Sequence, residues 1–117
     1  MIVAGLGFRR GVSVESLRAA LALVGGAEAL ATVEDKAREP GLQALVVETG
    51  LRLHAVPQIE LVAQGIGGSD RVKALYGTGS VAEAAALAAA GPGARLVVPK
   101  LTGPDGHVVV ALAEGGA

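Results

Sequence analysis

The chain has 117 residues, the length of one domain, and its ten Lys and Arg nearly balance its eleven Asp and Glu. A net charge of −1 argues against partners that select a basic surface, which excludes nucleic acid and anionic membranes, and two aromatic residues give no stacking platform for bases. Without cysteine there is no disulfide or thiolate metal site, and no apolar run reaches the roughly 18 residues of a membrane span, so we expect a soluble, cytoplasmic domain.

Short apolar runs alternate with helical patterns along the chain, as in an α/β domain with a largely parallel sheet. Ser13 is a predicted N-cap, and Gly25 and Gly50 are predicted helix ends. The expected elements are strands at 2–6, 29–34, 51–56, 95–99 and 107–113, and helices that begin at Ser13, Pro40, Pro57 and Ser80. The helix after Pro57 is expected to align Ile59, Val62 and Ile66 on one face.

Five glycines weaken the pattern between residues 65 and 79, so we expect a surface connection there with one helical turn near Val72 and Leu75. Turn residues at 102–106 predict that the last two strands pair as an antiparallel hairpin. Right-handed crossovers place helices on both faces of the sheet. The sequence therefore predicts a three-layer α/β domain whose mostly parallel sheet has about five strands and a C-terminal antiparallel hairpin.

Ser80 and Glu83 have the spacing of a capping box, in which the serine side chain and the glutamate carboxylate each satisfy a free N–H of the first turn. Six alanines follow between residues 84 and 90, and Gly91 and Pro92 end the helix. A helix of so little bulk can lie close against a sheet or a flat ligand. Its N-terminus favours a carboxylate or phosphate, which makes Ser80 a candidate ligand-binding residue.

Further candidate ligand-binding residues fall at the ends of expected strands, where open α/β sheets bind their ligands. Gly7, Arg9, Arg10 and Gly11 belong to a glycine turn after the first strand, and the two guanidinium groups can each grip a carboxylate through two hydrogen bonds. The remaining candidates are Lys36 and Lys100. For each cation, the competing interpretation is a solvated surface side chain.

The turn from Gly5 to Gly11 occupies the position of a phosphate-binding loop, but its G-x-G-x-x-x-G spacing departs from the dinucleotide motif. Three interpretations stay open: a structural turn, a loop for another anion, and a small NADP-binding module. Weak candidates for acid–base catalysis are Glu34, Asp35 and Glu83, for which solvated or capping roles are the alternatives. His54 and His107 fall on separate strands, and neither a metal motif nor a nucleophile motif is present, so we expect a binding protein without metal or cofactor.

Four segments, at 5–13, 30–42, 79–87 and 96–100, resemble the CobE family of cobalamin-biosynthesis proteins, which is equivalent to the C-terminal domain of CbiG. The resemblance runs in order over nearly the whole chain, so residues 1–117 are expected to form one such domain. The cysteine that is usual in the first loop of the family is replaced here by Phe8.

The resemblance implies a role at the corrin-ring stage of vitamin B12 assembly, where two-domain relatives open a ring lactone of a cobalt-precorrin. We expect the chain to bind or present a precorrin or hydrogenobyrinate intermediate through its carboxylates. The alternative is a hydrolase that opens the lactone, with Glu34, Asp35 or Glu83 as the general base. A further corrin-pathway enzyme, such as a precorrin methyltransferase, is the expected protein partner.

Overall fold

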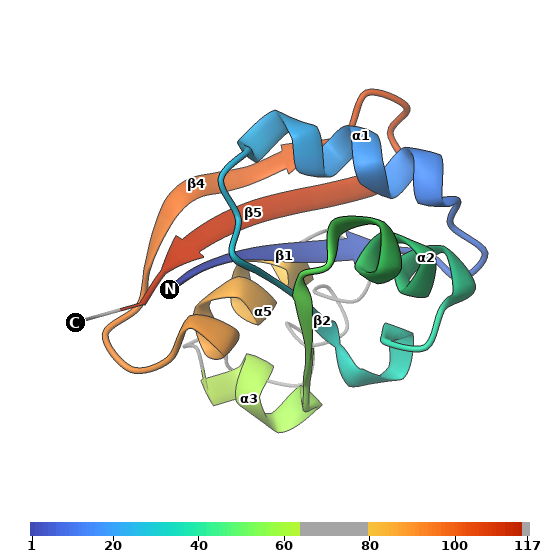
Figure 1. Ribbon diagram of the computed structural model, residues 1–117. Coiled ribbons are helices and arrows are strands. Elements are labelled where there is room, and N and C mark those ends of the chain that lie inside the picture. Colours follow the sequence, from blue (N-terminus) through green and yellow to red (C-terminus); the bar gives the residue numbers. More distant parts are fainter. Residues whose placement is uncertain (64–79, 116–117) are drawn as a thin grey trace.

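The computed structural model describes residues 1–63 and 80–115, which form five strands and their covering helices (Figure 1). In chain order these are β1 (Ile2–Phe8), α1 (Val14–Val24), β2 (Ala29–Val33), the 3-10 helix η1 (Glu34–Lys36), α2 (Pro40–Thr49), β3 (Arg52–Val56), α3 (Gln58–Ala63), α5 (Ser80–Ala90), β4 (Arg95–Thr102) and β5 (Val108–Glu114). No helix in these ranges is both long and apolar enough to cross a bilayer.

The five strands form one mixed sheet in the order β3-β2-β1-β5-β4. The pairs β1–β2 and β2–β3 are parallel, whereas β5 is antiparallel to both of its neighbours, β1 and β4. Four strands therefore run in one direction and β5 alone opposes them. This arrangement confirms the predicted mostly parallel sheet with an antiparallel C-terminal hairpin.

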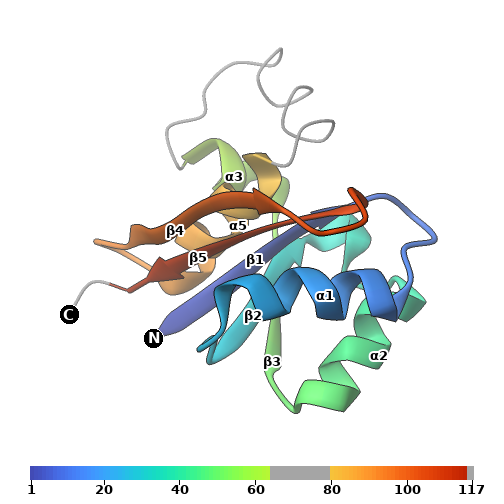
Figure 2. The ribbon, with the colours of Figure 1, turned by 90° about the horizontal axis from the view of Figure 1, so that it is seen from above.

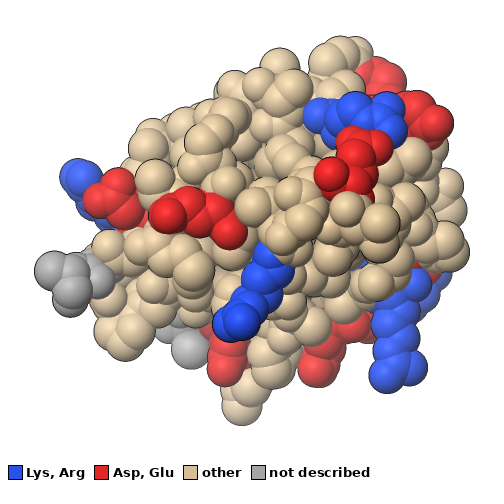
Figure 3. Space-filling model, viewed as in Figure 1, with Lys and Arg blue, Asp and Glu red and all other residues tan. Residues whose placement is uncertain are grey.

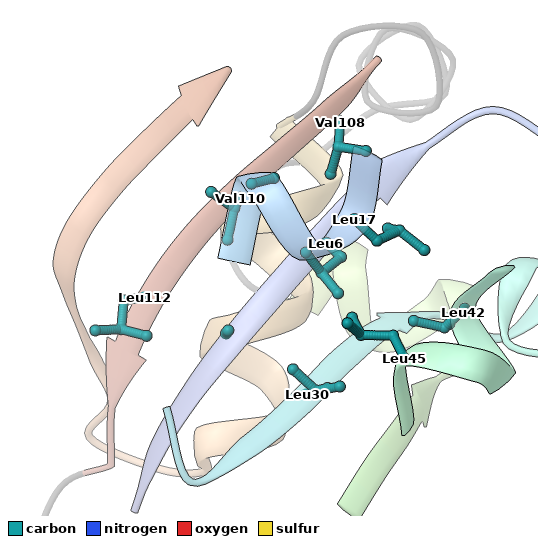
Figure 4. Packing of buried hydrophobic residues seen from close by; sticks show 10 residues of the cluster. Leu6, Leu17, Leu30, Leu42, Leu45, Val108, Val110 and Leu112 are labelled. Carbon is teal, nitrogen blue, oxygen red and sulfur yellow. The ribbon is translucent and has the colours of Figure 1, made fainter. Parts of the chain in front are cut away.

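Helices cover both faces of the sheet, with α1 and α2 on one face and α3 and α5 on the other (Figure 2). Leucine and valine side chains fill the layer between the sheet and the α1–α2 face (Figure 4). Its labelled members are Leu6, Leu17, Leu30, Leu42, Leu45, Val108, Val110 and Leu112. Each fully buried leucine of this kind stabilises the fold by about 1.5–3 kcal/mol. The core therefore holds in place the two helices whose first residues lie at the carboxyl end of the parallel strands.

The opposite layer is built from much smaller side chains. Ala82 and the run 84–86 on α5 are fully buried against the sheet. A Cβ atom added to Gly5 of β1 would overlap the carbonyl oxygen of Ala82 and lie 2.8 Å from the backbone nitrogen of Ala86. The backbone of α5 thus rests directly on β1, so the alanine face is used for packing against the sheet.

Most helix ends were predicted correctly because local chemistry determines them. The Ser13 hydroxyl accepts a hydrogen bond from the Ser16 N–H at 3.1 Å and caps α1. Gly25 follows α1, and Gly50 follows α2 with φ of 70°, a left-handed conformation that favours glycine. The second, third and fifth strands match their predicted bounds to within one residue.

Three local predictions need correction or lie outside the described residues. Strand β1 continues to Phe8, so Gly5 and Gly7 belong to the strand and not to a turn. The predicted apolar face after Pro57 is wrong at Ile59, whose side chain is 78% exposed, because the six-residue α3 presents Leu61 to the core instead. The side chain of Val62, together with Ile66, Val72 and Leu75 of the weak stretch, lies outside the described residues.

Candidate functional site

A pocket of about 610 Å³ lies at the carboxyl end of the parallel strands, between the loop that follows β1 and the turn that joins β4 to β5. Both connections lie at the same end of the sheet in Figures 1 and 2. The volume falls within the range of ordinary small-molecule sites. Its lining residues are Arg9, Arg10, Gly11, Val12, Ser13, Ser16, Gly106 and His107.

The loop wall of the pocket is a tight turn from Arg9 to Val12. The Val12 N–H donates to the Arg9 carbonyl oxygen at 3.3 Å, and Gly11 adopts φ of 82° at the third position of the turn. The Gly11 N–H donates to Glu39 Oε1 at 2.7 Å, so the turn is fastened to the start of α2. Both arginine side chains of the pocket therefore come from a turn whose backbone is fixed at several points.

The amino end of α1 forms a second part of the wall. Ser13 caps the helix through Ser16, and the Leu17 N–H donates to the Ser13 carbonyl oxygen at 3.2 Å. The positive end of the α1 dipole thus lies beside the two arginines, and all of these groups favour an anion.

The third part of the wall is the β4–β5 turn, which is tied to α1 by the carboxylate of Asp105. The Ser16 hydroxyl donates to Asp105 Oδ2, and the His107 N–H donates to Oδ1 at 3.0 Å. The hydrogen bond from Ser16, followed by the one from His107, lowers the pKa of Asp105 below its ordinary value. Asp105 therefore holds together two pocket walls that are far apart in the sequence.

The structure brings together three of the predicted ligand-binding residues, Arg9, Arg10 and Gly11, and places the others elsewhere. Gly7 pairs with Val109 inside the sheet. Lys36 Nζ donates to the Phe8 carbonyl oxygen at 2.7 Å and lies 5.8 Å from the Phe8 ring centroid, so this ammonium ties η1 to the end of β1.

Lys100 was expected just after the fourth strand and instead lies within the edge strand β4, where the register shifts between Val98 and Leu101. The Lys100 N–H donates to Glu83 Oε2 at 3.1 Å. Glu83, one of the catalytic candidates, therefore has a structural role, because its carboxylate holds the backbone of β4. Ser80 is the first residue of α5, but its side chain, and with it the predicted capping box, lies outside the described residues.

The other catalytic candidates, Glu34 and Asp35, are exposed in η1 and are not among the residues that line the pocket. His54 lies on β3 with its Nε2 atom buried and unpaired among the described residues. No group of three or more His, Asp or Glu side chains in residues 1–63 and 80–115 is arranged to hold a metal ion.

Sequence reasoning missed the pocket roles of Ser16, Gly106 and His107, and the contact of Glu39 with the loop. The turn predicted at 102–106 forms one wall of the pocket, but no local pattern indicated that this turn contacts α1. Figure 3 shows scattered charges of both signs on the face that carries α1 and α2, without a continuous basic patch. On the face seen in Figure 3, no broad basic surface therefore adds to the charge of the two pocket arginines.

The fold and the pocket define a three-layer α/β domain with a mixed sheet and a polar, arginine-bearing site at the carboxyl end of its parallel strands. The family model described as cobalamin synthesis G C-terminus matches residues 2–113, and the chain belongs to this family of cobalamin-biosynthesis proteins.

Solved structures agree with this assignment. The chain is 34% identical to the cobalamin biosynthesis protein chiG from Agrobacterium tumefaciens, with full coverage of both chains and a TM-score of 0.76. It is 35% identical to CobE, a protein from the vitamin B12 biosynthetic pathway, over 97% of this chain and 89% of that one, with a TM-score of 0.73. A cobalamin biosynthesis protein G homolog from Sulfolobus solfataricus shares the fold at 19% identity and a TM-score of 0.69, over 99% of this chain and 37% of that one. A comparison with curated proteins found no match.

Proposed function

We propose that the protein binds or presents a corrin-ring intermediate, a precorrin or hydrogenobyrinate, through the carboxylates at the edge of the ring. The observation that carries this proposal is the meeting of Arg9, Arg10 and the amino end of α1 around one pocket. Corrin precursors carry several acetate and propionate groups around an apolar macrocycle. A pocket with two guanidinium groups beside a helix dipole suits two such carboxylates, because each planar fork matches one carboxylate through two hydrogen bonds.

The pocket is better suited to binding the carboxylates of the corrin ring than to catalysing a reaction. Glu34, Asp35 and Glu83, the general bases of the lactone-hydrolase alternative, are not among its lining residues, and the Glu83 carboxylate accepts a hydrogen bond from Lys100. The NADP alternative loses its basis because two glycines of its turn belong to β1. A binding protein of this kind passes its cargo to another corrin-pathway enzyme, such as a precorrin methyltransferase.

A titration with hydrogenobyrinic acid, followed by ultraviolet–visible absorbance, tests this function. The double variant Arg9→Lys/Arg10→Lys keeps both charges and loses the forks, so we expect affinity to fall on the order of tenfold, or about 1.4 kcal/mol. The matched control is Arg52→Lys/Arg95→Lys, which changes two exposed arginines at the first residues of β3 and β4, at the opposite end of the sheet.

Equal affinities of the Arg9/Arg10 variant and the wild type at matched salt would remove the pair from the site. Tight binding of NADPH by a protein that binds no corrinoid would overturn the proposal as a whole.

A further inference from the structure

Glu39 occupies the N-cap position of α2, but its carboxylate does not cap that helix through a hydrogen bond within the described residues. It turns instead to the pocket loop, where Oε1 accepts from the Gly11 N–H at 2.7 Å and Oε2 lies 3.6 Å from Arg10 Nη1. Glutamate is a poor N-cap residue, since serine, threonine, aspartate and asparagine are preferred there. Both contacts of the Glu39 side chain therefore stabilise the pocket loop and not the first turn of α2.

The two contacts of the Glu39 carboxylate differ in strength. The Arg10 side chain is 65% exposed, so solvent screens its pair with Glu39. The hydrogen bond from Gly11 is short and has a charged acceptor, and the Glu39 side chain is only 15% exposed. The stronger contact is thus the one that holds the backbone of the turn.

The first turn of α2 also packs directly against the same loop. A Cβ atom added to Gly41 would overlap the Val12 carbonyl oxygen and lie 3.2 Å from its carbonyl carbon, so the backbones of α2 and the loop are in direct contact. Arg9, in contrast to Arg10, forms no ion pair with any residue that the structure describes. The two neighbouring arginines therefore have different surroundings, and only Arg9 has a guanidinium that is not committed to Glu39.

We propose that Glu39 is the positioning residue of this anion pocket. Its carboxylate fixes the Arg9–Val12 turn through Gly11 and holds Arg10 in the absence of ligand. Arg9 meets one carboxylate of the ligand directly, and Arg10 reaches a second carboxylate only by leaving Glu39. This inference rests on the proposed function, since it assigns separate roles to groups of the same pocket.

Two substitutions separate positioning from simple charge. Glu39→Gln keeps an oxygen that accepts from Gly11 and releases Arg10, so we expect its affinity for hydrogenobyrinic acid to equal or exceed that of the wild type. Glu39→Ala removes the acceptor, and we expect its affinity to fall on the order of tenfold. The Gly11 amide proton resonance, measured without ligand, should move strongly upfield in Glu39→Ala and much less in Glu39→Gln.

The matched control is Glu28→Ala, which removes an equivalent bond, from the Ile2 N–H to Glu28 Oε1 at 2.8 Å, at the other end of β1. It should leave both the affinity and the Gly11 resonance unchanged. Equal tightening of binding in both Glu39 variants would mean that the carboxylate only repels the anion, and an unmoved Gly11 resonance in Glu39→Ala would mean that it does not hold the turn. Either result overturns the proposal. If the wild type binds no hydrogenobyrinic acid, the proposed function fails, and the Gly11 resonance alone then decides whether Glu39 holds the turn.

Discussion

Substitution of Gly5 by alanine tests the contact on which the α5 side of the fold depends. The new methyl group would overlap the Ala82 carbonyl oxygen and approach the Ala86 nitrogen to 2.8 Å. Both atoms belong to the helix backbone, so no change of side-chain rotamer can relieve the overlap. Helix α5 must move away from the sheet by about 1.5 Å to restore an ordinary contact distance.

This movement has a large expected effect because Ala82 and residues 84–86 of α5 are fully buried, and their short methyl side chains lose contact with the sheet as soon as the helix moves. Overpacking of a core costs about 1–3 kcal/mol, and a collision with backbone belongs at the upper end, so we expect a loss of about 3 kcal/mol. In a chain of this size such a loss lowers the thermal midpoint by roughly 10–15 °C.

Urea unfolding followed by far-ultraviolet circular dichroism measures the loss. Gly50→Ala is the control, because Gly50 has a positive φ and open space around it, and its substitution costs only about 1–2 kcal/mol of backbone strain. Adding Ala82→Gly to Gly5→Ala should not restore stability, since the obstructing atom is a carbonyl oxygen. A loss in Gly5→Ala no larger than that in Gly50→Ala, or a rescue by Ala82→Gly, would refute the packing argument.

Two further predictions concern the pocket. The pKa of Asp105 is lowered in the folded protein, first by the hydrogen bond from Ser16, so its stabilising contribution is complete above the ordinary aspartate pKa and disappears as the pH falls through the folded value. The difference in urea midpoint between wild type and Asp105→Asn should therefore narrow from pH 6 to pH 3, and a constant difference would contradict the assignment. Gly41→Ala should push the loop at Val12 outward and weaken binding of hydrogenobyrinic acid on the order of tenfold, with an unchanged circular dichroism spectrum. Unchanged affinity in a titration would show that the loop tolerates the shift.

Much of the fold could be predicted because short-range chemistry determines it. Ser13 and Gly50 mark helix ends through hydrogen bonds and dihedral angles that involve only neighbouring residues. The alternation of apolar strands and helices likewise follows from periodicity along the chain. Such signals need no knowledge of distant residues.

The errors arise where a distant segment determines the local structure. Gly5 and Gly7 have the local pattern of a turn, but β5 pairs with both, and Gly5 is required because α5 approaches the strand so closely. The fourth strand extends beyond its predicted end at Pro99, although proline lacks an N–H donor. An edge strand with an irregular register accommodates it, so β4 continues to Thr102.

The same distinction between local and distant contacts applies to the pocket residues. Arg9, Arg10 and Gly11 could be predicted as neighbours because they follow one strand of a parallel sheet. The hydrogen bond between the Ser16 and Asp105 side chains connects residues that are 89 positions apart, and no local pattern indicates it. The same reason hid the role of Glu39, whose carboxylate faces a loop 28 residues earlier in the chain.

The position of β5 inside the sheet, between β1 and β4, affects how the molecule forms on the ribosome. Ile2 of the first strand pairs with Glu114 of the last one, so the edge of β1 stays open until nearly the whole described chain has been synthesised. The parallel unit of β1, β2 and β3 emerges first, and some of its apolar side chains stay exposed until β5 pairs with β1. The wall of the pocket that contains His107 arrives with that same strand. Nascent chains that have not yet formed β5 therefore lack the complete pocket, and a ligand that fills it stabilises only chains in which β5 has paired with β1.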